Sequence, residues 1–525
     1  MKKLSLLVFL LLLKLGIFGL EIPSFELHKG LVNFNSWAET VNFLDINNDN
    51  YPDLLVGGNS LYVNRSQGGK IVFDKCDLPN LRGSSAVAFD FNNDGWTDFA
   101  TSGGNLMQNN GDGTFADVAN QCKFTPHVKS GSMAVGDLDN DGFADVIIGM
   151  LEDWNGANSA YYPLQVFMNR GGKYFEEVAE KLKINSSKYS RSLIIYDFDG
   201  NGFQDIYVGN YRLQPNYLWM NYGDNKFIDE AEKRGVQGKF EPNRFYDEVQ
   251  KCRYGYRYGH TLGCLIFDWN NDGNMDLWVS NLAHKYIGFR KKDPTQYDVR
   301  GYYCDDSAIY CNNGDGYFRD CRGDLGLMPE PIGVARDELW SSVIASDINN
   351  DSYEDVFVPQ IYSLPYSNAK IFLNDMGRKF VDISDKIEAK IFDSYCGAWA
   401  DIDCDGDMDL ITFGRLESNR GGEIYCLLNN SKVLKNSYRK VILRSSATQT
   451  AVGAVVKLID KESIQTRFFG SYGSYRNQQN DPALHFACPQ GVENCEVTIK
   501  WASGVVEKYQ LKDNCTVIYA PPKKQ

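Results

Sequence analysis

The sequence predicts an all-β fold: a seven-bladed β-propeller followed by a small C-terminal β module. Three observations predict it: an acidic nine-residue string that recurs seven times, a Phe-anchored strand between the copies, and a final segment that lacks both. Short strands joined by tight polar turns at this period are typical of four-stranded propeller blades. We expect a signal peptide at residues 1–20, the propeller over residues 21–432, and the module over residues 433–525.

The first twenty residues have the composition of a secretory signal peptide. Lys2 and Lys3 precede an apolar run from Leu4 to Leu13, and Gly19 offers a small residue for cleavage. The alternative is an uncleaved membrane anchor, but Lys14 interrupts the apolar stretch and makes a stable span costly. The sequence therefore predicts a secreted, extracellular protein with no membrane span after signal cleavage.

The charge balance excludes one class of partner and favours another. Asp and Glu number 68 against 54 Lys and Arg, which gives a formal net charge of -14 at pH 7. A nucleic-acid-binding protein needs a basic face to meet the phosphates, so we expect no nucleic-acid partner. An acidic surface attracts cations instead.

The acidic string begins and ends with Asp in every copy. Its third residue is Asp or Asn, its fifth is Asp except for Asn201, and its sixth is Gly except for Asn50 and Ser352. The candidate metal ligands at positions 1, 3, 5 and 9 are Asp45, Asn47, Asp49 and Asp53; Asp90, Asn92, Asp94 and Asp98; Asp137, Asp139, Asp141 and Asp145; Asp197, Asp199, Asn201 and Asp205; Asp268, Asn270, Asp272 and Asp276; Asp347, Asn349, Asp351 and Asp355; and Asp401, Asp403, Asp405 and Asp409.

Oxygen side chains at positions 1, 3 and 5 lie on one side of a tight turn. With a main-chain carbonyl at position 7 and the carboxylate at position 9, they offer six or seven oxygens, which suits Ca²⁺ better than Mg²⁺. An EF-hand loop starts in the same way but needs Glu at position 12, where these copies have Val, Thr or Ile. The alternative is a set of hairpin turns that need no metal. We predict up to seven calcium ions, with the loops at Asp45 and Asp347, which lack Gly, as the weakest sites.

Between the acidic strings, an apolar strand ends in Asn and is followed by Gly and then Phe. Six Phe-anchored strands lie between consecutive strings, and none follows the last string. Phe25 to Leu27 precedes the first string instead, so we expect this segment to form the outer edge of the last blade. Such a clasp joins the two ends of the propeller and leaves no free seam. The alternative is that Phe25 belongs to a loose lead-in.

The residues from about 433 onward have no acidic string and contain strand-like runs, with turns at 470–474 and 502–504. The acidic loops resemble the FG-GAP/VCBS repeats of integrin α-chain-type propellers. The runs VGAVVKL from Val452, LHF from Leu484 and VTIKWASG from Val497 resemble the UnbV/ASPIC region. Together they are similar to the cartilage acidic protein-like family, and this resemblance implies a secreted, calcium-binding, matrix- or surface-associated protein.

Residues 231–262 and 284–308 make the fourth and fifth repeats the longest. Long loops on a rigid scaffold commonly bind ligands, so we expect an extracellular protein or glycan ligand there, bound by a monomeric adhesion or matrix module. The alternatives are a purely structural matrix role and a secreted polysaccharide lyase or hydrolase. We expect no enzyme, because HExxH and GxSxG motifs are absent. The clustered Tyr residues are Tyr246, Tyr254, Tyr256, Tyr258, Tyr297, Tyr302 and Tyr303, and the enzyme candidates are His260, His284, Arg253 and Arg257.

Thirteen Cys residues in a secreted chain predict disulfides, with buried free thiols as the alternative. The pairs that lie near in sequence are Cys252 with Cys264, Cys304 with Cys311 or Cys321, and Cys488 with Cys495. Five N-x-S/T sequons are glycan sites only on a eukaryotic secretory path, and the one at Asn350 lies inside an acidic loop. The other four begin at Asn64, Asn185, Asn429 and Asn514.

Overall fold

The computed structural model describes residues 22–523 apart from short internal gaps, so the predicted signal peptide lies outside the described residues. The gaps are residues 35, 79, 156–157, 161, 185–188, 248–251, 284–301, 328–337, 363–366, 388–389, 417–420, 432–436, 460–463 and 489–494. Side chains are also not described at residues 153–160, 241–257, 283 and 302–304. No helix among the described residues is long and apolar enough to cross a membrane.

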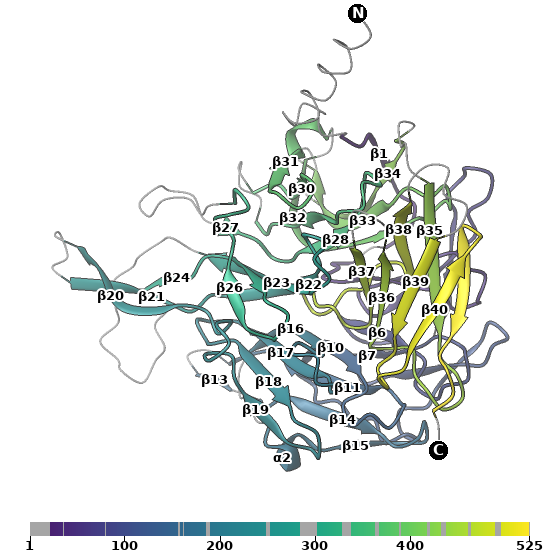
Figure 1. The fold of residues 1–525 in the computed structure, drawn as a ribbon, viewed down its shortest axis with the longest axis horizontal. Helices are drawn as coiled ribbons and strands as arrows, with labels where there is room; N and C mark the ends of the chain where they lie inside the picture. The colour runs from purple at the N-terminus through teal and green to yellow at the C-terminus, as the bar shows by residue number, and fades with distance from the viewer. Residues whose placement is uncertain are drawn as a thin grey trace, which may run out of the picture.

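The acidic repeats fold into four-stranded antiparallel sheets (Figure 1). Each acidic loop joins the first and second strands of its own sheet. These two strands are buried on both faces, because neighbouring sheets pack on either side. The first four sheets contain β2 (Val41–Leu44), β3 (Asp53–Val56), β4 (Ser60–Asn64) and β5 (Phe73–Cys76); β6 (Ala86–Phe89), β7 (Asp98–Thr101), β8 (Leu106–Asn109) and β9 (Phe115–Asp117); β10 (Ser130–Gly136), β11 (Asp145–Met150), β14 (Gln165–Asn169) and β15 (Phe175–Glu177); and β16 (Ser190–Tyr196), β17 (Asp205–Asn210), β18 (Tyr217–Asn221) and β19 (Phe227–Asp229).

The remaining propeller sheets continue the same pattern. They contain β22 (Thr261–Phe267), β23 (Asp276–Ala283), β25 (Ala308–Asn312) and β26 (Phe318–Asp320); β28 (Ile344–Ser346), β29 (Asp355–Val358), β30 (Lys370–Asn374) and β31 (Phe380–Asp382); and β32 (Ile391–Ala400), β33 (Asp409–Leu416), β34 (Glu423–Asn429) and β1 (Phe25–Lys29). The first strands of successive sheets contact one another, and β2 also contacts β32. The all-β prediction is confirmed, and the number of seven blades stays a prediction. Smaller elements are β12 (Asp153–Asn155), β13 (Asn158–Ala160), α2 (Ala179–Leu182), β27 (Glu338–Leu339) and η1 (Ser384–Lys386).

The predicted N-terminal clasp is confirmed. β1 pairs antiparallel with β34, with Phe25 opposite Asn429 and Lys29 opposite Tyr425. The Phe25 ring lies 6.3 Å from the ring of Trp399 in the first strand of the same sheet. The strand that the last repeat lacks is therefore supplied from the N-terminal side of the chain.

An Asn at the end of each third strand joins neighbouring sheets. The side-chain amide of Asn64 donates to the main-chain oxygen of Pro52 in its own sheet and to that of Ile402 in the last sheet. This second bond links the first and last sheets, 338 residues apart in sequence. The same bond to the preceding sheet is made by Asn109, Asn169, Asn221, Asn312, Asn374 and Asn429.

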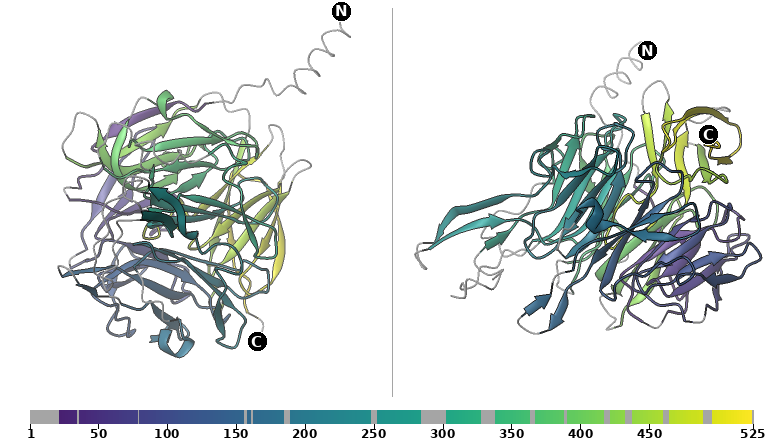
Figure 2. Two further views of the ribbon diagram at one scale, coloured as in Figure 1. Left: turned by 90° about the vertical axis from the view of Figure 1, so that its left-hand side faces the viewer. Right: turned by 90° about the horizontal axis from the view of Figure 1, so that it is seen from below.

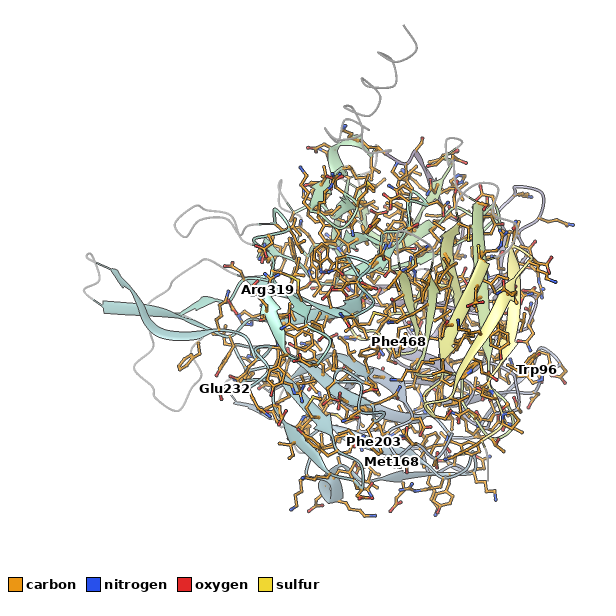
Figure 3. All side chains as sticks on the ribbon, in the orientation of Figure 1. Trp96, Met168, Phe203, Glu232, Arg319 and Phe468 are labelled. Carbon is orange, nitrogen blue, oxygen red and sulfur yellow. A yellow bond between two sulfur atoms is a disulfide. The ribbon has the colours of Figure 1, made fainter. Side chains whose placement is uncertain are left out.

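The C-terminal segment forms two packed sheets on one side of the propeller, opposite the projecting strands β20 and β21 (Figures 1 and 2). They enclose a core around Phe486 and Trp501. Phe468 lies between this segment and the propeller sheets (Figure 3). The strands are β35 (Ser437–Arg444), β38 (Ala483–Cys488) and β41 (Cys515–Tyr519) in one sheet, and β36 (Ala454–Ile459), β37 (Ile464–Phe469), β39 (Cys495–Lys500) and β40 (Val506–Leu511) in the other.

Residues 470–482, between β37 and β38, enter the centre of the propeller. We call this segment the plug. The N–H of Phe43 donates to the Gln479 carbonyl, and the Gln479 side chain exchanges two hydrogen bonds with the main chain of Ala88. Further hydrogen bonds from the plug reach the first strand of each of the remaining propeller sheets. They involve the main chain of Val135, Ile195, Ile266, Ala345, Gly397 and Trp399. The sequence predicted only a turn here; the plug instead satisfies the inner strand edges, which would otherwise bury unpaired N–H groups.

The long fourth and fifth repeats contribute a separate sheet of β20 (Phe240–Asp247), β21 (Cys252–Arg257) and β24 (Tyr302–Cys304). Of the clustered tyrosines, only the Tyr258 side chain lies within the described residues, and its ring stacks on Phe240 at 5.6 Å. The side chains of Tyr246, Tyr254, Tyr256, Tyr297, Tyr302 and Tyr303 lie outside them.

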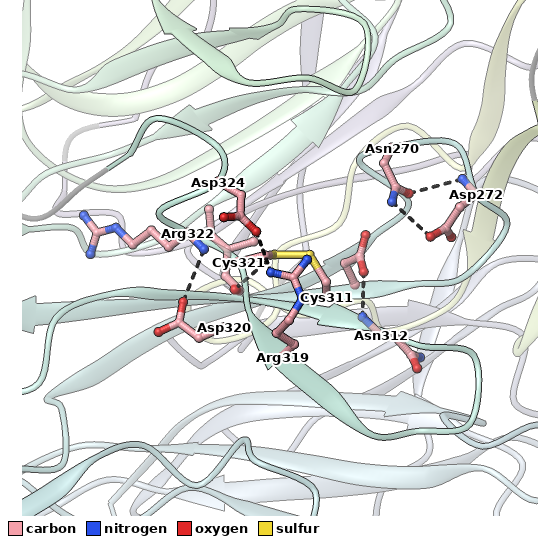
Figure 4. Close-up of a disulfide and its surroundings, with 11 residues drawn as sticks. Asn270, Asp272, Cys311, Asn312, Arg319, Asp320, Cys321, Arg322 and Asp324 are labelled. Carbon is pink, nitrogen blue, oxygen red and sulfur yellow. Dashed lines mark hydrogen bonds and ion pairs between the residues drawn. A yellow bond between two sulfur atoms is a disulfide. The ribbon is translucent and has the colours of Figure 1, made fainter.

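The cysteines correct two predictions. Cys311 and Cys321 form a disulfide, so neither pairs with Cys304 (Figure 4). Cys264 is a buried free thiol, so its predicted pairing with Cys252 is wrong. The two cysteines belong to different elements: β22 buries Cys264 between sheets, whereas Cys252 begins β21.

The structure brings the third predicted pair of cysteines together. The Sγ atoms of Cys488 and Cys495 lie 3.0 Å apart, where β38 ends and β39 begins. This separation is longer than the roughly 2.05 Å of a disulfide bond.

Candidate metal centres

Position 1 of each acidic loop closes the turn. The Oδ2 of Asp401 accepts a hydrogen bond from the N–H of Gly406 at 3.0 Å, and every other loop repeats this contact. The sixth residue has a positive φ in every loop, and Asn50 and Ser352 adopt it where the others have Gly. The substitution of Gly in these two loops is therefore accommodated in the same turn.

The side chains at positions 3 and 5 accept hydrogen bonds from main-chain N–H groups of their own loop. The Oδ1 of position 5 accepts from the N–H of position 7 in every loop, as at Asp94 and Trp96. The Oδ1 of position 3 accepts from the N–H of position 5 in six loops, as at Asn92 and Asp94. These are Asx-type turns, which form without metal.

The ninth Asp has a structural role that the sequence did not reveal. The Oδ1 of Asp409 accepts from the N–H of Asn429, the interlocking Asn of its sheet, and its Oδ2 accepts from Ile402. The Oδ1 bond recurs in every loop, at Asp53, Asp98, Asp145, Asp205, Asp276 and Asp355. Its invariance within the chain is therefore explained by hydrogen bonds as well as by the predicted metal.

Several loop oxygens nevertheless lack any partner. The Oδ1 atoms of Asp45, Asp139, Asp197 and Asp401 are buried without a hydrogen bond. A buried carboxylate oxygen without a partner is costly, and a hard cation removes that cost by coordination. The donor set is all oxygen, so the residues present fit calcium.

Three loops bring their carboxylates closest together. Carboxylate oxygens lie within 4.8 Å of one another in the groups Asp137, Asp139 and Asp145; Asp197, Asp199 and Asp205; and Asp401, Asp403 and Asp409. Among the described residues these are the groups spaced to share one ion. The remaining loops combine Asp with Asn, whose amide oxygen is a neutral ligand.

Burial changes the protonation of these loops. It raises the pKa of Asp53 to about 7 and that of Asp98 to about 8, although hydrogen bonds from main-chain N–H groups oppose the shift. Burial raises the pKa well above its usual value at Asp145, Asp205, Asp276, Asp355 and Asp409. Burial in a metal-free loop therefore favours the protonated form of the ninth Asp, whereas a bound cation would favour the ionised form.

The C-terminal segment brings cations to three first-position aspartates. Arg444 approaches Asp45 at 2.7 Å, Lys440 approaches Asp401 at 2.5 Å, and Lys500 approaches Asp197 at 3.2 Å. Each basic group contacts Oδ2, whereas the Oδ1 of the same carboxylate has no partner. The C-terminal segment and a bound metal would thus share one carboxylate in each of these loops.

The predicted glycosylation sequons differ in their exposure to solvent. Asn64 and Asn429 are each 1% exposed and donate their amides within the sheets, so the folded protein cannot carry glycans there. Asn514 is exposed, and Asn185 lies outside the described residues.

Of the enzyme candidates, His260 is buried with its ring 4.9 Å from Tyr211. The side chains of His284, Arg253 and Arg257 lie outside the described residues.

Two family models match parts of this arrangement, one in the acidic loops and one in the C-terminal segment. A family model described as an FG-GAP-like repeat matches residues 90–148, and one described as ASPIC and UnbV matches residues 444–517. The chain thus has one segment similar to FG-GAP-like repeats and another similar to ASPIC and UnbV, which are the resemblances that its sequence predicted.

Among individual proteins, the chain is similar to cartilage acidic protein 1. The Xenopus tropicalis protein is 25% identical over 344 residues, 65% of this chain and 46% of that protein. The Homo sapiens protein is 22% identical over 343 residues, 64% of this chain and 44% of that protein. The chain therefore matches less than half the length of these relatives. Among solved structures, BBS1N in complex with ARL6DN covers 79% of this chain and 100% of its own, with a TM-score of 0.40 and 8% identity.

Proposed function

We propose that this protein is a secreted calcium-binding β-propeller that acts as an extracellular binding or adhesion module. The observation that carries the calcium role is the set of buried loop oxygens without partners, at Asp45, Asp139, Asp197 and Asp401. The likeness to FG-GAP-like repeats supports the same ion. Calcium stabilises the fold in this proposal and takes part in no reaction, because the loops recur with nearly equivalent ligand sets.

Secretion and the partner belong to the same proposal. The Cys311–Cys321 disulfide supports an oxidising, extracellular compartment, since disulfides rarely persist in a reduced cytosol. The strands β20 and β21 of the fourth repeat project away from the C-terminal segment (Figure 2), which leaves their side of the molecule for a protein or glycan ligand. We expect a monomer without catalytic activity. Turnover of a polysaccharide by the purified protein would instead support the lyase or hydrolase alternative.

Calorimetric titration of calcium into chelator-treated protein tests the metal role. Asp401→Asn removes one charge from a loop whose oxygens lie close enough to share an ion, so the variant should bind one fewer ion or bind it more weakly. Asp112→Asn is the matched control, because Asp112 is exposed and lies outside the acidic loops. A wild-type protein that takes up no calcium would show that the loops are metal-free turns.

A further inference from the structure

A cavity of about 310 Å³ lies at the centre of the propeller. Its lining residues Glu39, Arg191 and Leu262 lie at or just before the starts of first strands, whereas the acidic loops follow the ends of those strands. The cavity therefore opens on the face opposite the acidic loops and the C-terminal sheets. The tip of the plug, Tyr475 and Arg476, reaches across the propeller and forms part of the cavity wall.

Two ion pairs, one buried and one with a partly exposed Glu39 carboxylate, supply the polar groups of this cavity. A guanidinium nitrogen of Arg191 contacts Glu152, and the Nη2 of Arg476 lies 2.5 Å from the Oε2 of Glu39. Arg191 is 9% exposed, Glu152 8% and Arg476 6%. Each positive charge at the cavity is thus balanced by a carboxylate.

Aromatic rings form much of the remaining wall. The Arg191 guanidinium lies 5.1 Å from the centre of the Tyr211 ring, and that of Arg476 lies 5.2 Å from the Tyr475 ring. The rings of Tyr395 and Tyr475 are 5.5 Å apart. Tyr362 is 42% exposed and stands at the mouth. Buried leucine and isoleucine side chains pack behind Tyr475.

We propose that this cavity binds one neutral pyranose unit of a glycan. A pyranose has an apolar C–H face that packs on aromatic rings, and hydroxyl groups that bond to guanidinium and carboxylate groups. The balanced charges favour a neutral ligand over an anion, because an acidic sugar would meet Glu39 and Glu152. The cavity volume is at the low end of the about 300–1,000 Å³ typical of ligand pockets, so it suits a single sugar ring. This inference deepens the binding role proposed above and rests on it.

Saturation-transfer NMR with the full protein in calcium buffer tests the site. The neutral probes are the methyl pyranosides of glucose, galactose and mannose, and the anionic probes are methyl glucuronide and acetate. We expect saturation transfer to at least one neutral pyranoside, and Tyr362→Ala should weaken its binding by about tenfold. Tyr222→Ala is the matched control, because Tyr222 is also 42% exposed but follows β18 and does not line the cavity. It should leave binding unchanged.

A second variant tests the role of charge balance. Glu39→Gln leaves Arg476 without its carboxylate and should shift binding from the neutral pyranosides towards glucuronide. The proposal is overturned if no neutral pyranoside binds at about 10 mM, if glucuronide or acetate is preferred by the wild type, or if both variants bind as the wild type does. Calcium titration of the same samples separates the two proposals, since sugar binding without calcium uptake would contradict only the metal role.

Discussion

The Nζ of Lys440 lies 2.5 Å from the Oδ2 of Asp401, so a buried cation of the C-terminal segment contacts the first residue of the last acidic loop. Burial alone would lower the pKa of Lys440, but the carboxylates of Asp401 and Asp481 outweigh it and raise that pKa. The lysine therefore stays charged. This ion pair links the packing of the C-terminal segment to a candidate metal centre of the propeller.

Lys440→Met should strongly destabilise the protein. Removing one partner of a buried ion pair leaves an uncompensated charge, which costs about 3–5 kcal/mol of unfolding free energy. The control is Lys508→Met, because Lys508 pairs with Glu496 on the surface of the same segment, where a pair contributes about 1 kcal/mol or less. Denaturant unfolding measures both variants. Equal losses would mean that the buried pair is unimportant.

Chelation of calcium should lower the melting temperature substantially. Extracellular sites with a Kd of about 10⁻⁴ to 10⁻³ M at about 1 mM calcium each contribute roughly 0.4–1.4 kcal/mol. Seven such sites would contribute roughly 3–10 kcal/mol, comparable with the stability of an ordinary domain. Scanning calorimetry and limited proteolysis with EDTA measure the effect, and magnesium addition is the control for ion specificity. Unchanged melting and proteolysis would contradict a stabilising metal.

In chelator, the protein should become less stable as the pH rises from about 4 to about 8. Burial raises the folded-state pKa of Asp53 to about 7 and that of Asp98 to about 8, so the folded state binds more protons than the unfolded state in this range. The stability that these two carboxyls contribute is then fully present below their unfolded-state pKa of about 4. It is lost as the pH rises through their folded-state pKa values. Calcium should reverse this slope, because it binds the ionised carboxylates. Melting curves across this pH range, with and without calcium, measure both slopes.

The sequence predicted the repeat architecture because local patterns encode it. Turn residues and apolar pairs mark each blade, and the missing last Phe indicated that Phe25 completes the last sheet. The hydrogen bonds of the ninth Asp were not predicted, because Asn429, the partner of Asp409, lies 20 residues away at the far end of the next strand. Nothing local distinguishes a ligand oxygen from one that accepts main-chain N–H groups.

The plug and the cysteine pairing depended on long-range contacts that a single sequence does not reveal. Gln479 contacts Ala88, 391 residues away, and its segment has the composition of an ordinary turn. The axial cavity was missed for the same reason, since Glu39, Glu152, Arg191 and Arg476 come together only when the sheets surround the plug. The local feature that could have drawn attention to the cavity was Arg476, a charged residue within the Gly- and amide-rich run 470–481.

Glycans on protein secreted from eukaryotic cells should be found at Asn514 and not at Asn64 or Asn429. Asn64 and Asn429 donate their side-chain amides to carbonyls in two sheets each, so a modified amide would break the link between neighbouring blades. Asn514 is exposed. Peptide mass spectrometry locates the glycans, with Asn514→Gln as the control that should remove the signal. A glycan at Asn64 in folded protein would contradict the interlocking role of that amide.

Gly473→Ala should detach the plug from the propeller. Gly473 has a φ of +115°, and a Cβ there would lie 2.1 Å from the main-chain oxygen of Cys264 in β22. The matched control is Gly504→Ala, because Gly504 has a φ of +80° but no atom within 4 Å of the added Cβ. Both variants carry the about 1–2 kcal/mol cost of a left-handed alanine, so any excess loss at Gly473 reports the clash with the propeller strand. We expect Gly473→Ala to increase protease cleavage between residues 470 and 482. In calorimetry, the C-terminal segment of this variant should unfold separately from the propeller. The variant should also lose pyranoside binding, because the plug forms part of the cavity wall. Identical unfolding of the two variants would show that the plug is not needed to hold the C-terminal segment on the propeller.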